Sequence, residues 1–154
     1  MSKARDRQVN DDRPLRLGRP RAALVVYRVI DGRPHVLLVG ASKTPGKLTL
    51  PGGKIDAGET PMRAAMRETA EEAGVLTDPP QALGEYLHRK SNRRYHPTQT
   101  FLARFVGTLH EYEGRARRWL DVEALRDPSL KLRKPIRKQL ASAFASLERR
   151  RAAA

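Results

Sequence analysis

The sequence predicts a single mixed α/β domain. β-rich runs fill most of residues 22–50, a helical stripe of small and apolar residues lies between 62 and 73, and further strand-like segments precede a second helical stripe near the C-terminus. This alternation of strands and helices indicates a mixed sheet covered by helices. The 154 residues are enough for one domain with its own core and too few for two.

The first half of the domain is predicted to begin with a β-hairpin. Residues 22–29 are rich in β-branched and aliphatic residues, Asp31-Gly32 is typical of a tight hairpin turn, and residues 36–39 form the returning strand. Residues 43–47 read as a turn. A short strand over 48–50 is then expected to end at Pro51-Gly52-Gly53.

The first helix has clear start and stop residues. Thr60 can cap its N-terminus and Pro61 suits the first helical position. Gly74 is placed to end the helix in a left-handed conformation. One inward face is predicted from residues at three- and four-residue spacing: Met62, Ala65, Met66, Thr69 and Ala73.

The second half is predicted to contain three more strands and a last helix. Strands are expected over 82–90 and 98–109, joined by a loop, with a short strand over 118–120. Asp121 is expected to cap a short helical turn over 122–125. A final helix is expected from Lys134-Pro135 to about Leu147.

The ends of the chain are predicted to lie outside the domain. Residues 1–18 are polar and basic without an apolar period, which indicates a flexible arm. The folded domain is expected over residues 19–148, and a basic tail over 149–154. We expect a monomer or a small homo-oligomer.

Composition excludes some functions and favours others. The chain has no cysteine, which excludes disulfides, thiolate metal sites and cysteine nucleophiles and is compatible with a cytoplasmic protein. No apolar run approaches the length of a membrane span, so no membrane association is expected. Lys and Arg number 31 against 17 Asp and Glu, giving a net charge of +14. Such a charge favours a polyanionic partner, which could be nucleic acid, an anionic membrane surface or a phosphate-rich small molecule.

One segment of this basic chain is acidic. Residues 53–75 hold five acids and three bases, a local charge of −2. Glu68, Glu71 and Glu72 are spaced i, i+3 and i+4, so they project from one face of the helix. One interpretation is that the three glutamates form only a solvated surface of the helix. The adjacent Gly52-Gly53, whose backbone carbonyls can approach closely, favours instead a site for a hard cation such as Mg²⁺.

The same segment carries a longer pattern, Gly53-x5-Glu59-x7-Arg67-Glu68-Thr69-x-Glu71-Glu72-x-Gly74-Val75. This pattern resembles the Nudix box of the Nudix hydrolases. Eight of its nine fixed positions match. The departure is Thr69, where the family has a bulky aliphatic residue. The resemblance extends over about residues 21–147 and implies the family's α/β/α sandwich, with a mixed β-sheet between helices.

The resemblance implies roles for individual residues. Glu68 and Glu72 match metal-binding positions, and the carbonyl of Gly52 is the implied backbone ligand. Glu71 matches the position usually assigned as proton acceptor for the attacking water, although in some relatives Glu68 or a glutamate outside the box has this role. The structural positions of the box are Gly53, Glu59, Arg67 and Gly74. The implied reaction is hydrolysis of a diphosphate linkage with Mg²⁺ as cofactor and Mn²⁺ as the alternative.

Flanking residues suggest the substrate. Short segments around Leu37, Trp119 and Pro135 are similar to the diphosphoinositol polyphosphate phosphohydrolase branch of the family. Basic residues in 89–94, 115–118 and 131–138 could form a cationic rim for a polyphosphorylated small molecule. The candidate substrate-binding residues are Arg21, Ser42, Lys43, Arg93, Arg94, Arg117 and Lys134.

Several substrates and one different function remain open. Diphosphoinositol polyphosphates and dinucleoside polyphosphates fit the charge best. Nucleoside triphosphates, nucleotide sugars and capped RNA ends are alternatives within the same enzyme class. A protein with the Nudix fold that only binds RNA is the alternative from another class, and the complete set of box acids disfavours it.

Overall fold

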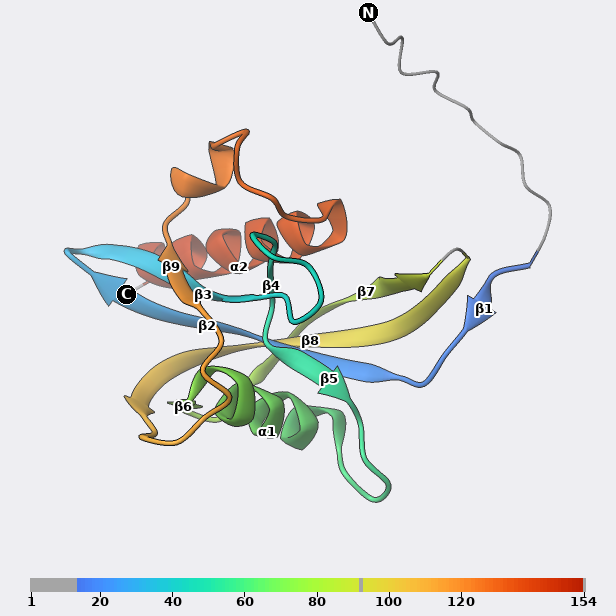
Figure 1. Ribbon diagram of the computed structural model, residues 1–154. Helices are drawn as coiled ribbons and strands as arrows, with labels where there is room; N and C mark the ends of the chain where they lie inside the picture. Colours follow the sequence, from blue (N-terminus) through green and yellow to red (C-terminus); the bar gives the residue numbers. More distant parts are fainter. Residues whose placement is uncertain (1–13, 92, 154) are drawn as a thin grey trace, which may run out of the picture.

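The computed structural model describes residues 14–91 and 93–153 and has three layers. A mixed β-sheet lies between α1 (Pro61–Ala73) and α2 (Lys134–Ala153), which cover opposite faces of the sheet (Figure 1). This arrangement confirms the predicted α/β/α sandwich. None of the helices in the described ranges combines the length and the apolar character needed to cross a membrane.

The centre of the sheet is built from four long strands. β2 (Arg21–Ile30) and β3 (Arg33–Gly40) form the predicted hairpin, and its turn residues Asp31 and Gly32 have φ angles of 51° and 75°. β8 (Arg94–Thr108) runs parallel to β2, and β7 (Gln81–Ser91) pairs antiparallel with β8. The sheet is therefore mixed, with β2 between a parallel and an antiparallel neighbour.

Short strands complete the sheet, and three of them were not predicted. β4 (Leu48–Thr49) and β9 (Arg117–Leu120) were expected and both pair with β3. The unpredicted strands are β1 (Arg16–Leu17), β5 (Gly52–Lys54) and β6 (Val75–Thr77). β1 and β6 pair with β8, and β5 pairs with β2. The expected turn after Asp121 is a 3-10 helix, η1 (Ala124–Arg126).

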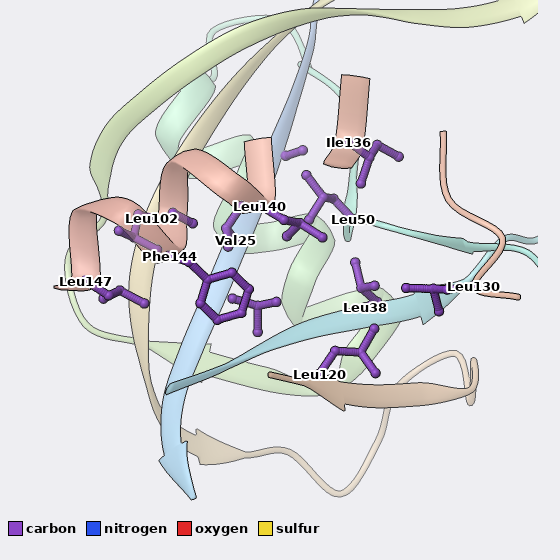
Figure 2. Close-up of a cluster of buried hydrophobic side chains, with 13 residues drawn as sticks. Val25, Leu38, Leu50, Leu102, Leu120, Leu130, Ile136, Leu140, Phe144 and Leu147 are labelled. Carbon is purple, nitrogen blue, oxygen red and sulfur yellow. The ribbon is translucent and has the colours of Figure 1, made fainter. Parts of the chain in front are cut away.

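Two apolar cores lie on the two faces of β2, because alternate residues of a strand point to opposite sides. Ala23 and Val25 face α2, where they join Ile136, Leu140 and Phe144 (Figure 2). The intervening residues of β2 face α1 and pack against its small side chains: Ala22, Leu24 and Val26 on β2, and Ala64, Ala65 and Ala73 on α1.

The predicted caps of α1 are confirmed. Thr60 Oγ1 accepts a hydrogen bond of 3.2 Å from Arg63 N, and Gly74 has a φ of 65° with its N–H bonded to Ala70 O. Thr69, which departs from the box pattern, is fully buried, and its hydroxyl donates to Ala65 O at 2.7 Å. The hydroxyl is therefore satisfied inside the helix, so Thr can occupy an aliphatic position.

Part of each predicted chain end belongs to a regular element of the structure. Residues 1–13 of the expected arm lie outside the described residues, while Arg16–Leu17 pair in parallel with Arg94–Tyr95. At the other end, α2 continues past Leu147 through the basic residues 149–151 to Ala153. Arg and Ala favour helix, which explains why the expected tail extends α2 instead.

Candidate metal and catalytic site

The glycines before α1 let the helix approach the sheet closely. β5 pairs with β2, and its residue Gly52 donates a backbone hydrogen bond of 3.1 Å to Glu72 Oε2. A Cβ atom at Gly53 would lie 2.5 Å from Glu68 Cδ. The absence of a side chain at Gly53 therefore leaves the space in which the Glu68 carboxylate meets β5, while the Gly52 N–H binds the carboxylate of Glu72.

Glu72 is buried although it is a carboxylate. Only 4% of the residue is exposed, and burial raises its pKa to about 7, against the lowering effects of Arg115 and the Gly52 N–H. Arg115 Nη2 lies 3.6 Å from Glu72 Oε1. Glu68 adds negative charge and raises the pKa of Glu72 further. A cation placed between the two carboxylates would favour the charged form of Glu72.

Arg67 joins the loop before α1 to the acidic face of the helix. Its Nε donates to Glu59 Oε2 at 2.8 Å, and Nη2 donates to Lys54 O at 3.2 Å. Nη1 lies 3.0 Å from Glu68 Oε1. The hydrogen bond from Arg67 holds the pKa of Glu59 below its ordinary value. This network fixes the position of Glu68 relative to β5, because Arg67 binds both the Glu68 carboxylate and the backbone carbonyl of Lys54.

Glu71 differs in position from the other two acids. Its side chain is 50% exposed, and the nearest charged partner is Arg67 Nη1, 3.3 Å from Oε2. Glu68 and Glu72 line a cavity beside β5, whereas Glu71 is not among its lining residues. The i, i+3, i+4 spacing thus predicts a shared face but not which of the three carboxylates reach the cavity.

This cavity of about 640 Å³ opens between the start of β2, β5, β7 and the loop before β4. Four of the predicted substrate-binding residues line it: Arg21, Ser42, Lys43 and Arg94. Arg21 Nη2 also approaches Gly52 O at 3.4 Å. The cavity therefore places predicted rim residues beside the glycines and carboxylates of the box.

The other three predicted rim residues lie elsewhere. Arg117 Nη1 donates to Ala73 O at the end of α1, and its guanidinium lies 4.6 Å from the centre of the Tyr112 ring. Arg93 is in the turn between β7 and β8 with a φ of 63° and is not among the described residues lining the cavity. Lys134 lines a neighbouring cavity that shares the wall formed by Arg89, Lys90 and Arg133.

Several residues that line the cavity were not selected from the sequence. The basic segments were recognised from charge, but their members that line the cavity were not selected: Arg89, Lys90, Arg115 and Arg133. Three further residues that line the cavity have no sequence feature that marks them as site residues: Lys54, Tyr86 and His88. Burial and the charges of Arg21 and Arg133 lower the pKa of His88 to about 4, so its imidazole is neutral at pH 7.

The donors at this site suit a hard divalent cation. Within residues 14–91 and 93–153, no three His, Cys, Asp or Glu side chains gather closely enough to hold a metal by themselves. The set here is instead two carboxylates, from Glu68 and Glu72, together with the backbone carbonyl of Gly52. Mg²⁺ and Mn²⁺ prefer such oxygen ligands, and Mg²⁺ commonly completes its coordination with water and substrate phosphates.

We expect Gly53→Ala to damage the site more than the fold. The added Cβ would meet only the far end of the Glu68 side chain, which can rotate away. Displacing that carboxylate by about 1 Å should lower kcat by about 100-fold. Circular dichroism and urea unfolding should show a free energy of unfolding within about 1 kcal/mol of wild type. Unchanged kcat would mean that the position of Glu68 does not matter for turnover.

The chain is similar in sequence to a known protein family. The sequence profile of the NUDIX domain matches residues 18–144. The chain is 34% identical over 108 residues to diphosphoinositol polyphosphate phosphohydrolase 3-alpha of Mus musculus and to diphosphoinositol polyphosphate phosphohydrolase 2 of Rattus norvegicus. Each alignment covers 67% of this chain, and they cover 64% and 58% of the two relatives. The chain thus matches less than two thirds of their length.

Solved structures give the same fold. An Ap4A hydrolase of C. elegans, in a binary complex, has a TM-score of 0.62 at 25% identity, with 85% of this chain and 98% of that chain covered. A MutT NUDIX hydrolase of Burkholderia pseudomallei has a TM-score of 0.62 at 30% identity, with 81% and 98% covered. Since the family profile spans most of the domain and the α/β/α fold agrees with it, this chain belongs to the Nudix family.

Proposed function

We propose that this protein is a Mg²⁺-dependent pyrophosphohydrolase that cleaves a diphosphate linkage in a highly phosphorylated small molecule. Diphosphoinositol polyphosphates and dinucleoside polyphosphates are the substrate classes that we favour. The observation that carries the proposal is a single cavity that is lined both by the two box carboxylates and by a dense group of cationic side chains.

The cationic walls come from five separate parts of the chain. Nine Lys and Arg side chains line the cavity against two acids: Arg21, Lys43, Lys47, Lys54, Arg89, Lys90, Arg94, Arg115 and Arg133. Their charges act on one another, and the pKa of Lys90 is lowered, with Lys54 as the largest cause. Such crowding favours a ligand with many negative charges, because each phosphate group relieves repulsion and can accept hydrogen bonds from Arg.

The box residues supply the chemistry. We propose that Glu68, Glu72 and the Gly52 carbonyl hold Mg²⁺, which when bound neutralises phosphate charge and acidifies water. Glu68, as the acid beside Glu72 in the cavity lining, is proposed to accept the proton of the attacking water. Arg67 orients Glu68 through its contact of 3.0 Å, and Arg21 and Arg133 orient the phosphates.

The relatives support the favoured substrate classes. Those described above are named for diphosphoinositol polyphosphates and for Ap4A, a dinucleoside polyphosphate. A nucleoside triphosphate or a nucleotide sugar carries fewer phosphates and would engage fewer of the cationic walls. RNA binding without hydrolysis would leave the carboxylates of Glu68 and Glu72 in the cavity without a role.

A substrate panel tests the proposal. The purified protein is incubated with a diphosphoinositol polyphosphate, Ap4A, a nucleoside triphosphate and a nucleotide sugar, each with Mg²⁺, with Mn²⁺ and with excess EDTA. We expect product release that depends on the divalent cation and is fastest for the first two substrates. Salt-dependent RNA binding with no hydrolysis of any substrate would support the binding-protein alternative instead.

We expect Arg133→Gln to weaken substrate binding without changing the chemical step. Arg133 lines the cavity, and losing one phosphate contact should raise KM about tenfold with kcat within about twofold of wild type. Arg126→Gln is the matched control, because this exposed residue of η1 loses the same charge outside the cavity lining. Equal effects of the two variants would mean that only net charge matters.

A further inference from the structure

The segment that leads into β2 is fixed on two sides. On one side, Gly18 N donates to Tyr95 O of β8 at 2.7 Å. On the other side, Ile55 N donates to Pro20 O at 3.2 Å, and Arg19 Nη2 donates to Ile55 O at 3.2 Å. Residues 18–20 are therefore held between β8 and the loop that follows β5.

His96 lies at the centre of these contacts. It is 2% exposed, and its Nδ1 is 2.8 Å from Arg19 O. Because a carbonyl oxygen can only accept a hydrogen bond, Nδ1 carries the hydrogen. A Cβ atom at Gly18 would overlap the His96 ring, so only glycine allows this segment to pack flat against the imidazole.

Arg21 lies two residues after Arg19, whose carbonyl binds His96. It starts β2 and pairs with both Thr98 of β8 and Lys54 of β5. Its guanidinium reaches the cavity and lies 3.4 Å from Gly52 O, the carbonyl beside the two box carboxylates. The path of residues 18–20 thus sets where the Arg21 side chain enters the cavity.

We propose that His96, packed on Gly18 and bonded to Arg19 O, is a positioning residue that holds the Arg21 guanidinium at the phosphate-binding wall. It acts on substrate affinity through Arg21 and touches neither substrate nor metal. This role rests on the proposed function, since it assumes that the cavity binds a polyphosphate.

Three variants distinguish a loss of Arg21 positioning from a loss of folding. His96→Leu removes the hydrogen bond to Arg19 O but also removes Nε2, which is buried without a hydrogen-bond partner among the described residues. The two effects oppose each other, so the fold should survive. His96→Asn keeps a donor near the place of Nδ1. Gly18→Ala leaves His96 intact and disturbs the packing from the other side.

The test measures KM and kcat with the best substrate of the panel, and the affinity for inorganic tripolyphosphate by calorimetry. We expect His96→Leu and Gly18→Ala each to raise KM and the tripolyphosphate Kd about tenfold with kcat within about twofold, and His96→Asn to stay within about threefold of wild type. In an Arg21→Gln background, His96→Leu should raise KM by less than about twofold further, because its effect passes through Arg21.

Three results would overturn the inference: an unchanged KM in both His96→Leu and Gly18→Ala, the same increase in KM with and without Arg21, or a lower kcat at constant KM. If His96→Leu does not fold, Gly18→Ala alone and combined with Arg21→Gln decides the question. A wild-type protein that neither binds tripolyphosphate nor hydrolyses any substrate would instead overturn the proposed function, and the positioning role with it.

Discussion

Glu72→Gln is expected to lower kcat by about 1000-fold or more and to leave a folded protein. Glu72 is one of two acids that line the cavity, and it lies at the contact between α1 and β5. Gln cannot supply the negative charge that a divalent cation needs, and such electrostatic stabilisation contributes several kcal/mol to the barrier. Steady-state hydrolysis at saturating Mg²⁺ measures the loss. Glu123→Gln, at an exposed position before η1, serves as the control.

The fold should survive because Gln keeps the structural contact of Glu72. Its side-chain oxygen can still accept the hydrogen bond from Gly52 N, and the cost of burying a charge is removed. Circular dichroism and urea unfolding at pH 8 without metal should give a free energy of unfolding no lower than wild type by more than about 1 kcal/mol. Wild-type activity in a folded Glu72→Gln protein would contradict the assigned metal site.

The raised pKa of Glu72 also fixes the sign of a pH effect on the metal-free protein. Its pKa is about 7 in the folded state against 4.5 as the ordinary value, so the folded state holds more protons between these two pH values. The contribution of Glu72 to stability is therefore present below about pH 4.5 and lost as the pH rises to 7. The Gln variant lacks this pH dependence, which gives the unfolding experiment an internal check.

The sequence predicted the elements whose evidence is local. Thr60 and Gly74 bracket α1 because a capping hydroxyl and a left-handed glycine act on adjacent backbone groups. β5 was missed because glycine has low strand propensity, and Gly52–Lys54 is a strand only through its pairing with β2. The same holds for β1, a two-residue strand that exists because β8 offers it hydrogen bonds.

The site also combines residues that are close in sequence with residues that only the fold brings together. The box lies within one helix and the residues just before it, so helical spacing alone places Glu68 and Glu72 on one face, and the pairing of β5 with β2 adds Gly53. The cationic walls come from distant segments. Arg115 and Arg133 reach the cavity from the loop before β9 and the residue before α2, and only the topology of the sheet brings them to β5. Arg117 has the same charge two residues after Arg115 but donates to the end of α1 instead.

Glu68→Gln and Glu71→Gln should differ strongly, although both remove one carboxylate from the same helical face. Glu68 lines the cavity, is fixed by Arg67 and lies against Gly53, so its loss should lower kcat by about 100- to 10,000-fold. Glu71 is half exposed outside the cavity lining, and its removal leaves Arg67 bonded to Glu59, Glu68 and Lys54 O. We therefore expect less than a tenfold loss for Glu71→Gln.

The comparison is made at saturating substrate over a range of Mg²⁺ concentrations, because Glu68 is proposed both to hold the cation and to accept the proton. A Glu68 variant that recovers activity at high Mg²⁺ would have lost mainly metal affinity, whereas a loss of kcat that persists at saturating Mg²⁺ indicates the proton acceptor. An equal or larger loss of kcat in Glu71→Gln would contradict the assignment. It would mean that Glu71 turns from Arg67 toward the cavity when substrate and metal bind, and that the proton acceptor is Glu71.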